Sequence, residues 1–402
     1  MITPDIIKAH AILLLVCLLF HSAVAPARAN DVERLDGTRI SEESLTAKME
    51  QLAKEAAVHG MAVSIFNKKK LVYNKAFGVK RTDTKEPLQT NTVFYGASFS
   101  KAVFAVLVMK FVEAGIIDLD TPLYKYLEKP IFEYEAKGWH EDFGELKGDT
   151  RLQTITARMC LMHTTGFPNW RWIEDDQKLK IKFQPGSNYS YSGEGFSYLQ
   201  VVLEKLTKQP LEQLMTKRIF EPFGMTMSSY TWQDRFEKNY CYGHNEKGEV
   251  LEKDKDNSAR AASTLETTPE DYARFIEAVL NGKGLKPASY QEMFRPQIRI
   301  RSKQQFGPLS REDTAANDKI QLSYGLGWGI LQTPYGYGAF KEGHGDGFEH
   351  YSILFPEKGL GIVIMTNSAN GESVFKELLE TAIADKYLPW EWQNYIPYKK
   401  AK

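Results

Sequence analysis

Ser98 and Lys101 are the two residues whose types and spacing most directly suggest chemistry. They lie three apart in FYGASFSK (residues 94–101), and the apolar run AVFAVLVM (102–109) follows at once. A small-residue turn before such a run predicts a buried helix whose first turn carries both side chains on one face. Unpaired N–H groups, the helix dipole and burial all favour an uncharged lysine amine at that place. A serine hydroxyl beside a basic amine is the minimum apparatus for nucleophilic catalysis.

The same Ser-x-x-Lys motif recurs at Ser373 and Lys376, where the surrounding sequence predicts a different role. Apolar residues at 374, 375, 378, 379, 382 and 383 mark one face of an amphipathic helix. The serine and lysine fall among glutamates on the other face, so we interpret this copy as solvated surface. The Ser98 copy therefore needs partner residues elsewhere in the chain before it indicates catalysis.

Three further stretches contain residues that can take part in such chemistry. QPGSNYSYSGEGF (184–196) is a turn that presents Tyr191 just before an apolar helical segment. LMHTTGFP (161–168) contains His163, which we interpret as a structural hydrogen-bonding residue. GHGDGF (343–348) leads from His344 into a predicted strand, whose first residues Glu349 and His350 are expected at the surface. The sequence has no His-Glu-x-x-His or Cys-x-x-Cys metal spacing and no Gly-x-Ser-x-Gly elbow.

Taken in chain order, these motifs resemble the serine β-lactamase and penicillin-binding-protein superfamily, in particular its class C-like branch of esterases and D-peptidases. The resemblance runs from residue 61 to about 385 and includes FEPFGM (220–225) and TPEDYARF (268–275). It implies that Ser98 is the acylated nucleophile, Lys101 its base or proton relay, and Tyr191 a partner in proton transfer. His344 matches the first position of the third motif, where relatives carry Lys or His. The resemblance implies neither a cofactor nor a metal.

The resemblance also implies where substrate is held. The N–H of Ser98 is one expected oxyanion donor, and an N–H after His344, that of Gly347, is the second. Gly345, Asp346 and Gly193 are the other candidate substrate-binding positions.

Two of these positions depart from the pattern of relatives that hydrolyse β-lactams. Gly193 stands where such relatives usually have Asn, whose amide would hold the amide arm of a β-lactam or peptide. Asp346 stands where they usually have Gly; it either orients His344, contacts substrate or is a solvated turn residue. The first departure predicts slow β-lactam hydrolysis at best.

The hydrophobic periodicity of the sequence predicts the helices and strands that must position these residues. An amphipathic helix is predicted over 41–57 and a hairpin over 61–66 and 71–78. Late strands are predicted at 325–330, 350–355 and 360–367, followed by a helix around 372–388. Early and late strands are too few to be stable apart, so we expect them to share one sheet. The predicted fold is α/β (α+β) and β-lactamase/transpeptidase-like: an antiparallel sheet flanked by helices, formed by 30–122 and 315–402, with a mostly helical region at 123–314.

Composition and the N-terminal sequence limit the expected partners and the expected location of the protein. The chain has 402 residues with 51 basic and 51 acidic side chains, and it lacks a basic block, which argues against nucleic acid as a partner. Residues 1–29 read as a signal peptide, with Lys8, an apolar run and ARA (27–29) as cleavage site, so 30–402 is the expected mature catalytic unit. We expect an exported protein, periplasmic or secreted, without an integral membrane domain in the mature chain. Cys160 and Cys241 are expected as buried free thiols, a disulfide between them being the alternative.

The resulting functional hypothesis is an exported serine hydrolase that forms an acyl-enzyme at Ser98. Its expected substrate is a small-molecule ester or a small amide of the D-amino-acid type. One alternative is a class C-like β-lactamase with a β-lactam-like substrate. Another is a catalytically silent protein that binds a cell-wall fragment or other ligand. The leaving group, the acyl chain and the oligomeric state stay open.

Overall fold

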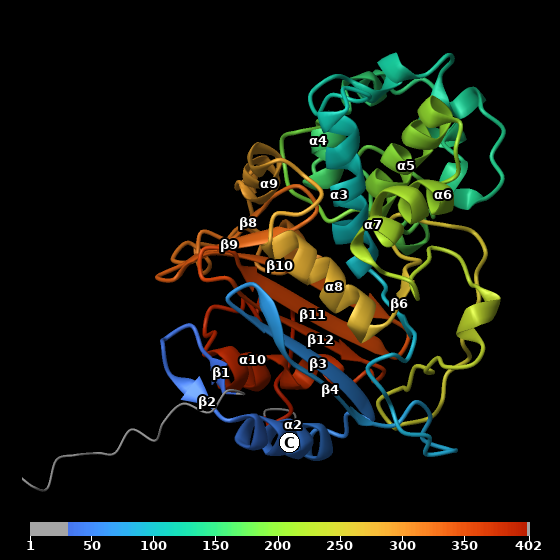
Figure 1. The fold of residues 1–402 in the computed structure, drawn as a ribbon. Helices are drawn as coiled ribbons and strands as arrows, with labels where there is room; N and C mark the ends of the chain where they lie inside the picture. Colours follow the sequence, from blue (N-terminus) through green and yellow to red (C-terminus); the bar gives the residue numbers. More distant parts are fainter. Residues whose placement is uncertain (1–30, 400–402) are drawn as a thin grey trace, which may run out of the picture.

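The early hairpin and the late strands form one antiparallel sheet in the computed structural model, which describes residues 31–399 (Figure 1). Its eight strands run in the order β4 (Lys70–Gly78), β3 (Gly60–Asn67), β12 (Leu360–Thr366), β11 (Phe348–Phe355), β10 (Gly336–Gly345), β9 (Gly329–Thr333), β8 (Ser323–Tyr324) and β7 (Ile298–Arg299). The first and last parts of the chain meet where β3 pairs with β12, with Ile65 opposite Ile362. The prediction of a shared sheet flanked by helices is confirmed.

Helices cover both faces of this sheet. On one face lie α2 (Glu42–Glu55) and α10 (Phe375–Ile383), and across the other runs α8 (Pro269–Leu280) (Figure 1). Beyond α8 lies a helical region with α3 (Phe99–Glu113), α4 (Ala157–Leu161), α5 (Gly193–Thr207), α6 (Leu211–Met215), α7 (Glu221–Phe223) and α9 (Pro287–Phe294). Two short sheets complete the strands: β1 (Val32–Glu33) with β2 (Arg39–Ile40), and β5 (Phe94–Tyr95) with β6 (Glu266–Thr267).

Alternation along the central strands divides the hydrophobic core in two. In β3, Ala62 and Phe66 face the helical region, while Val63 and Ile65 face α2 and α10. Neighbouring side chains of a strand point to opposite faces of the sheet. Because both faces are covered, the central strands read as continuous apolar runs rather than as alternating polar and apolar residues.

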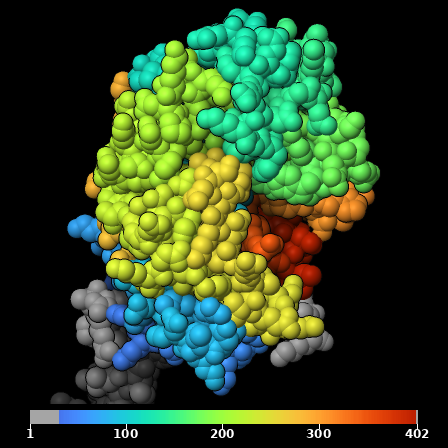
Figure 2. All heavy atoms as spheres, turned by 90° about the vertical axis from the view of Figure 1, so that its right-hand side faces the viewer, coloured from blue at the N-terminus to red at the C-terminus, as the bar shows by residue number. Residues whose placement is uncertain are grey.

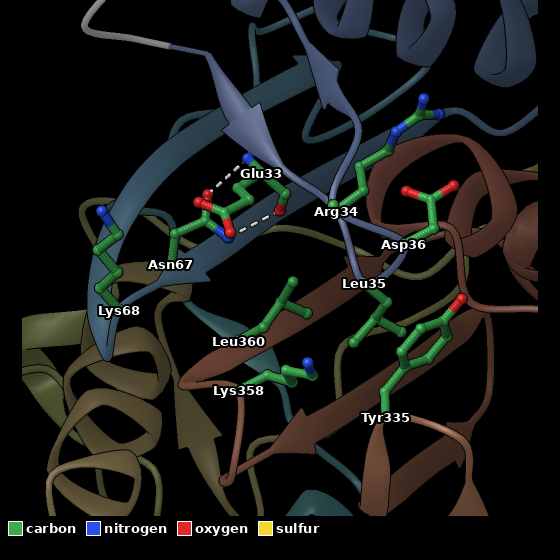
Figure 3. Close-up of a pocket in the computed structure, with 10 residues that line it drawn as sticks. Glu33, Arg34, Leu35, Asp36, Asn67, Lys68, Tyr335, Lys358 and Leu360 are labelled. Atoms are coloured by element: carbon green, nitrogen blue, oxygen red, sulfur yellow. Dashed lines mark hydrogen bonds between the residues drawn. The ribbon is translucent and has the colours of Figure 1, made fainter.

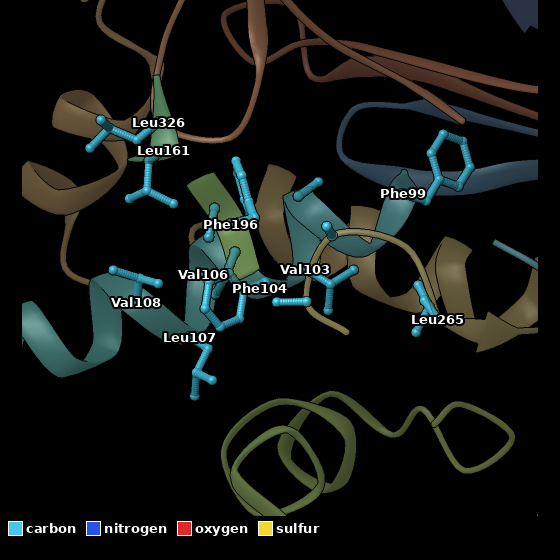
Figure 4. Close-up of a cluster of buried hydrophobic side chains, with 14 of the residues drawn as sticks. Phe99, Val103, Phe104, Val106, Leu107, Val108, Leu161, Phe196, Leu265 and Leu326 are labelled. Atoms are coloured by element: carbon cyan, nitrogen blue, oxygen red, sulfur yellow. The ribbon is translucent and has the colours of Figure 1, made fainter. Parts of the chain in front are cut away.

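The helix α3 is the centre of the larger cluster. Twelve of its residues are buried, from Phe99 to Phe111. Figure 4 shows Phe99, Val103, Phe104, Val106, Leu107 and Val108 of this helix with Leu161, Phe196, Leu265 and Leu326 from other elements. A helix that is apolar on all sides must be buried on all sides. Its first turn is therefore held rigidly.

Two late strands differ from their predicted positions. The predicted strand 325–330 begins only at residue 329, because 325–328 form a tight turn in which Gly325 N donates to Trp328 O at 2.8 Å. Gly327 has φ 84°, and a Cβ there would lie 2.4 Å from Ala105 Cβ of α3, so the turn needs glycine. The ten-residue strand β10 was not among the predicted strands.

Both cysteines of the described chain, Cys160 and Cys241, are buried free thiols. The predicted signal peptide, residues 1–29, lies outside the described residues. Among residues 31–399, no helix combines the length and apolar character needed to cross a bilayer.

Candidate active site

The turn before α3 presents Ser98 at the helix start. Ser98 is the N-cap residue of α3, but its hydroxyl makes no capping bond to the helix backbone. The preceding Ala97 has φ 45°, a left-handed conformation that a non-glycine residue adopts at a cost. The turn is held by Gly96 N, which donates to Leu265 O at 2.6 Å, and by Leu265 N, which donates to Ser100 Oγ at 3.0 Å. The serine hydroxyl is therefore fixed in place yet left available.

Lys101 lies directly beside that hydroxyl. Its Nζ is 3.0 Å from Ser98 Oγ and donates to Ala262 O at 2.7 Å. The side chain is fully buried. Burial, reinforced by the positive charge of Lys341, holds the pKa of Lys101 well below its ordinary range. A neutral Lys101 has a lone pair that can accept the Ser98 proton.

Tyr191 reaches the same point from the segment before α5. Its hydroxyl accepts a hydrogen bond from Lys341 Nζ at 3.0 Å. Burial raises the pKa of Tyr191 well above its ordinary value, while a hydrogen bond with Ser98 acts in the opposite direction. Tyr191 is therefore a neutral phenol that can still donate its proton. The structure thus brings Ser98, Lys101 and Tyr191 together.

His163 supports this arrangement from behind. Its Nδ1 accepts from Ser192 N at 3.0 Å, and its ring lies 4.2 Å from that of Tyr191. Burial lowers its pKa, so the imidazole is neutral. The prediction of a structural hydrogen-bonding histidine is confirmed.

Lys341 of β10 is a site residue that the sequence reasoning missed. It is fully buried, lies 3.4 Å from Glu342 Oε2 and donates to Glu342 O at 3.0 Å. Gln305 Nε2 donates to Glu342 Oε1 at 2.5 Å. Burial lowers the pKa of Lys341, and the adjacent carboxylate opposes that effect. A lysine and a glutamate inside the otherwise apolar stretch 338–343 were the available signal.

His344 lies three residues after Lys341 in β10 and points its Nε2 toward two carboxylates. The Nε2 atom is 3.4 Å from Glu349 Oε2 and 3.6 Å from Glu372 Oε2. Burial alone would lower the pKa of His344, but the two carboxylates outweigh it and raise the pKa to about 9. The three ligand-type atoms lie within 4.8 Å of one another, close enough to share protons or a cation. At neutral pH the imidazole is therefore a cation that shares this cluster with the side chains of Glu349 and Glu372.

Four of these side chains, Ser98, Tyr191, Glu342 and His344, help to line a cavity of about 210 Å³ between the sheet and the helical region. Tyr95, Ser98, Asn169, Trp170, Tyr191, Ser263, Phe306, Glu342 and His344 line it. Figure 2 shows the orange-red late strands between the green and yellow parts of the helical region. The cavity is lined by the predicted nucleophile, the tyrosine and the histidine, while Lys101 lies beneath Ser98.

The predicted glycines and Asp346 lie beside the cavity rather than among its described lining residues. A Cβ on Gly345 would lie 2.4 Å from the Tyr95 ring, so glycine lets β10 pass close to the turn before Ser98. Asp346 and Gly347 form the turn between β10 and β11, against Gly243. No contact tests whether Gly347 N–H serves as the second oxyanion donor, which stays a prediction.

The prediction that His350 and Glu349 lie at the surface is wrong. It is fully buried, with Nε2 2.8 Å from Tyr95 O and Nδ1 accepting from Thr366 N at 3.2 Å. Glu349 is also largely covered, with a side chain only 14% exposed. Both lie in β11 at the centre of the sheet, where the helical region covers one face and α10 the other, so polar residues there are buried and must find partners.

A second cavity of about 320 Å³ lies at the other side of the sheet (Figure 3). It is formed around β1 and the β3–β4 turn, where Asn67 exchanges two 2.8 Å hydrogen bonds with the Glu33 backbone. Serine, cysteine and histidine are absent from its described lining. The cavity has no nucleophile and base comparable to Ser98 and Lys101.

Comparisons with known proteins identify the family of this chain. The family model described as Beta-lactamase matches residues 45–385. A lovastatin esterase from Penicillium rubens is 27% identical over 305 residues, covering 65% of this chain and 75% of the relative. Protein flp from Staphylococcus aureus is 23% identical over 368 residues, covering 87% and 67%.

Solved structures show the same fold. The octameric penicillin-binding protein homologue from Pyrococcus abyssi superposes with a TM-score of 0.69 at 20% identity, over 89% of this chain and 80% of that chain. The D-alanine carboxypeptidase AmpC from Burkholderia cenocepacia superposes with a TM-score of 0.65 at 20% identity, over 85% and 98%. Because the family match spans most of the sequence and the fold agrees, this chain belongs to the beta-lactamase family of serine hydrolases.

Proposed function

We propose that the protein hydrolyses esters, and more slowly small amides of the D-amino-acid type, through an acyl-enzyme on Ser98. The observation that carries the proposal is the 3.0 Å approach of Lys101 Nζ to Ser98 Oγ, made by a buried lysine whose pKa is held well below its ordinary range. A base whose pKa is brought toward the working pH is what proton removal from serine requires. Tyr191, bound to Lys341, supplies a second proton carrier at the same hydroxyl.

In the acylation step, Ser98 Oγ attacks the substrate carbonyl and its proton passes to Lys101 Nζ. The carbonyl oxygen gains negative charge, which the N–H of Ser98 and that of Gly347 are proposed to bind. The carbon–oxygen bond to the leaving group then breaks. The departing alkoxide takes a proton from Tyr191, and Lys101 returns its own proton to the tyrosine.

In the second half of the reaction, water attacks the acyl carbon and loses a proton along the same route. The bond to Ser98 breaks, Ser98 Oγ regains a proton and the carboxylic acid leaves. Lys341 supports both halves, because its hydrogen bond to the Tyr191 hydroxyl at 3.0 Å stabilises negative charge that develops on the phenol.

The charges around His344 favour an ester over a substrate with a free carboxylate. Its imidazolium faces Glu349 and Glu372, at 3.4 and 3.6 Å, and not an unoccupied anion site. A substrate carboxylate would have to compete with these two groups. Gly193, in place of the usual Asn, also supplies no side-chain amide for a peptide or β-lactam arm. The lovastatin esterase relative supports the same preference.

We also propose that the enzyme works outside the cytoplasmic membrane, on the strength of the signal-like residues 1–29. Expression with residues 1–29 in a bacterial host should yield a protein beginning at Asn30 in the periplasmic or culture fraction. A chain retained in the cytosol with residues 1–29 intact would contradict export. It would leave the proposed ester hydrolysis unaffected.

The ester proposal is tested with a panel of simple acetate esters, D-alanine amides and nitrocefin. We expect the esters to be hydrolysed at the highest kcat/KM. Ser98→Ala should lower ester turnover by at least about 10³-fold. Ser373→Ala is the matched control, because that serine lies in the second Ser-x-x-Lys motif. This variant should keep the wild-type rate of ester hydrolysis. Turnover that survives Ser98→Ala, or nitrocefin hydrolysis faster than any ester, would contradict the proposal.

A further inference from the structure

The departure at Gly193 has a structural counterpart in Trp170. A Cβ built on Gly193 would lie 2.4 Å from the ring of Trp170, far inside van der Waals contact. The indole therefore occupies the space that a side chain at position 193 would need. Trp170 also lines the cavity of Ser98, and its ring centre is 5.7 Å from Lys101 Nζ. An apolar ring therefore lies beside both the nucleophile and the catalytic lysine.

The residues on both sides of Trp170 hold it in this position. Asn169 accepts the Gly193 N–H through both its backbone and its side-chain oxygen, each at 3.0 Å. Arg171 makes a bidentate pair, 2.9 Å for each bond, with the fully buried carboxylate of Glu194. Both anchors attach to the first turn of α5, which also follows Tyr191. The indole is therefore fixed relative to the catalytic groups.

Further apolar groups extend this surface away from the cavity. Trp172 stacks on Trp170 with ring centres 5.1 Å apart and an interplanar angle of 5°, and Trp139 meets both edge-on. Trp172 is 47% exposed and Ile173 is 58% exposed. We call Trp139, Trp170, Trp172 and Ile173 the tryptophan ledge. It is a continuous apolar surface that begins beside Ser98 and ends in solvent.

Phe306 makes another part of the cavity wall apolar as well. It is 41% exposed, lines the same cavity and packs edge-on against Tyr191 at 5.4 Å. The two arginines near the ledge do not make it an anion site. Arg171 is paired with Glu194 and Arg260 with Asp256, and both lie over Trp139.

We propose that the tryptophan ledge and Phe306 bind a flat apolar group of the substrate, an aromatic ring, on one side of the scissile ester. This proposal rests on the ester hydrolysis proposed above and names its substrate class. Indole faces bind flat apolar groups through burial and dispersion, and they prefer ring partners. The ring of the substrate belongs either to the acyl group or to the alcohol.

The test compares esters of similar intrinsic reactivity with a pH-indicator assay. Methyl acetate is the reference, methyl naphthylacetate places the ring in the acyl group, and naphthylethyl acetate places it in the alcohol. We expect at least about a tenfold higher kcat/KM for one of the two ring esters than for the reference. The arm that shows the preference identifies the side of the ester that the ledge binds.

Two variants then assign the preference to the ledge. Trp170→Ala and Trp172→Ala should each lower the ratio of ring-ester to methyl acetate kcat/KM by about threefold or more. Trp172 is half exposed, so its variant keeps the test valid if Trp170→Ala fails to fold. Tyr124→Ala, an equally exposed aromatic of the helical region that lines no part of the cavity, should keep the wild-type ratio.

The outcomes separate this proposal from the one on which it rests. Hydrolysis of methyl acetate with no preference for either ring ester would overturn the ledge and leave the esterase intact. A preference that survives both tryptophan variants would also overturn it. Absence of hydrolysis for all three esters would contradict the esterase proposal itself.

Discussion

At the scale of single residues, two identical Ser-x-x-Lys motifs show what separates a reactive serine from an ordinary one. Ser98 Oγ lies 3.0 Å from a fully buried lysine, whereas Lys376 pairs with Glu380 and Ser373 donates to Asn370 O at 2.7 Å. Burial lowers the pKa of Lys101, whereas Lys376 forms an ion pair with Glu380. The apolar run after Lys101 indicated this difference in the sequence. Lys341 could not be paired with Tyr191 from the sequence, because 150 residues separate them.

Lys341 is expected to set the pH at which the enzyme becomes active. Its positive charge helps to lower the pKa of Lys101, so Lys341→Met should raise that pKa toward the ordinary lysine value. The acid limb of the pH profile of kcat/KM should move to higher pH, because Lys101 must lose its proton before it can act as base.

The measurement is a pH profile of ester hydrolysis for wild type and Lys341→Met, with thermal unfolding to establish that both are folded. Lys376→Met is the control, because that lysine belongs to the surface copy of the motif. A folded Lys341→Met enzyme whose acid limb stays in place, or moves to lower pH, would contradict the assigned electrostatics.

At the scale of elements, hydrophobic periodicity correctly predicted the helices and strands whose pattern is set by neighbouring residues in the sequence. The helix expected at 41–57 is α2, capped by Ser41, whose side chain accepts from Ser44 N. The hairpin expected at 61–78 is β3 and β4. The helix expected at 372–388 is shorter, since α10 ends at Ile383 where Ala384 adopts φ 56°.

Elements whose environment is set by distant residues were harder to predict. The strand β10 contains four glycines, and these weaken a strand signal. Its glycines instead serve close approach, as at Gly345 beside Tyr95. His350 was expected at the surface because its burial depends on the helical region that covers β11. The ledge was missed because Trp139, which meets Trp170 and Trp172 edge-on, is distant from them in the sequence.

The burial of α3 predicts a large stability cost for shortening one of its core side chains. Phe104 is fully buried and its ring lies 6.0 Å from that of Phe196. Phe104→Ala should lower the free energy of unfolding by about 3–5 kcal/mol. Urea unfolding measures the change, and Val72→Ala, at a 42% exposed position, should stay within about 0.5 kcal/mol of wild type. A loss below about 1 kcal/mol for Phe104→Ala would show that α3 is not the centre of the core.

At the scale of the whole molecule, the site lies where the sheet and the helical region meet. The sheet supplies Lys341, Glu342 and His344 from β10, and the helical region supplies Ser98, Lys101 and Tyr191. The larger hydrophobic cluster packs the helical region against one face of the sheet, and the second cluster lies on the other face, under α2 and α10. Catalytic geometry therefore depends on the packing between the sheet and the helical region as well as within them.

The His344 group at this junction makes the stability of the molecule depend on pH. The pKa of His344 is raised from 6.5 to about 9, so the folded state holds a proton that the unfolded chain releases near pH 6.5. This contribution is fully present below about pH 6.5 and is lost as the pH rises through about 9. Glu349, whose burial raises its pKa to about 8, acts in the same direction.

Unfolding free energies of wild type and His344→Gln should therefore differ most below pH 6.5 and converge toward pH 9. Glu380→Gln, on the exposed side of α10, is the control and should show no such convergence. A difference that grows as the pH rises would mean that His344 is neutral in the folded protein.

The most direct test of the central claim is mass spectrometry of the protein after reaction with a fluorophosphonate. Peptide mapping should find one adduct, on Ser98, and its rate of formation should rise with pH as Lys101 loses its proton. Ser98→Ala should remain unmodified, whereas Ser373→Ala should react like wild type. Folded wild-type protein without an adduct, or an adduct on any other residue, would contradict the assignment of Ser98 as the nucleophile.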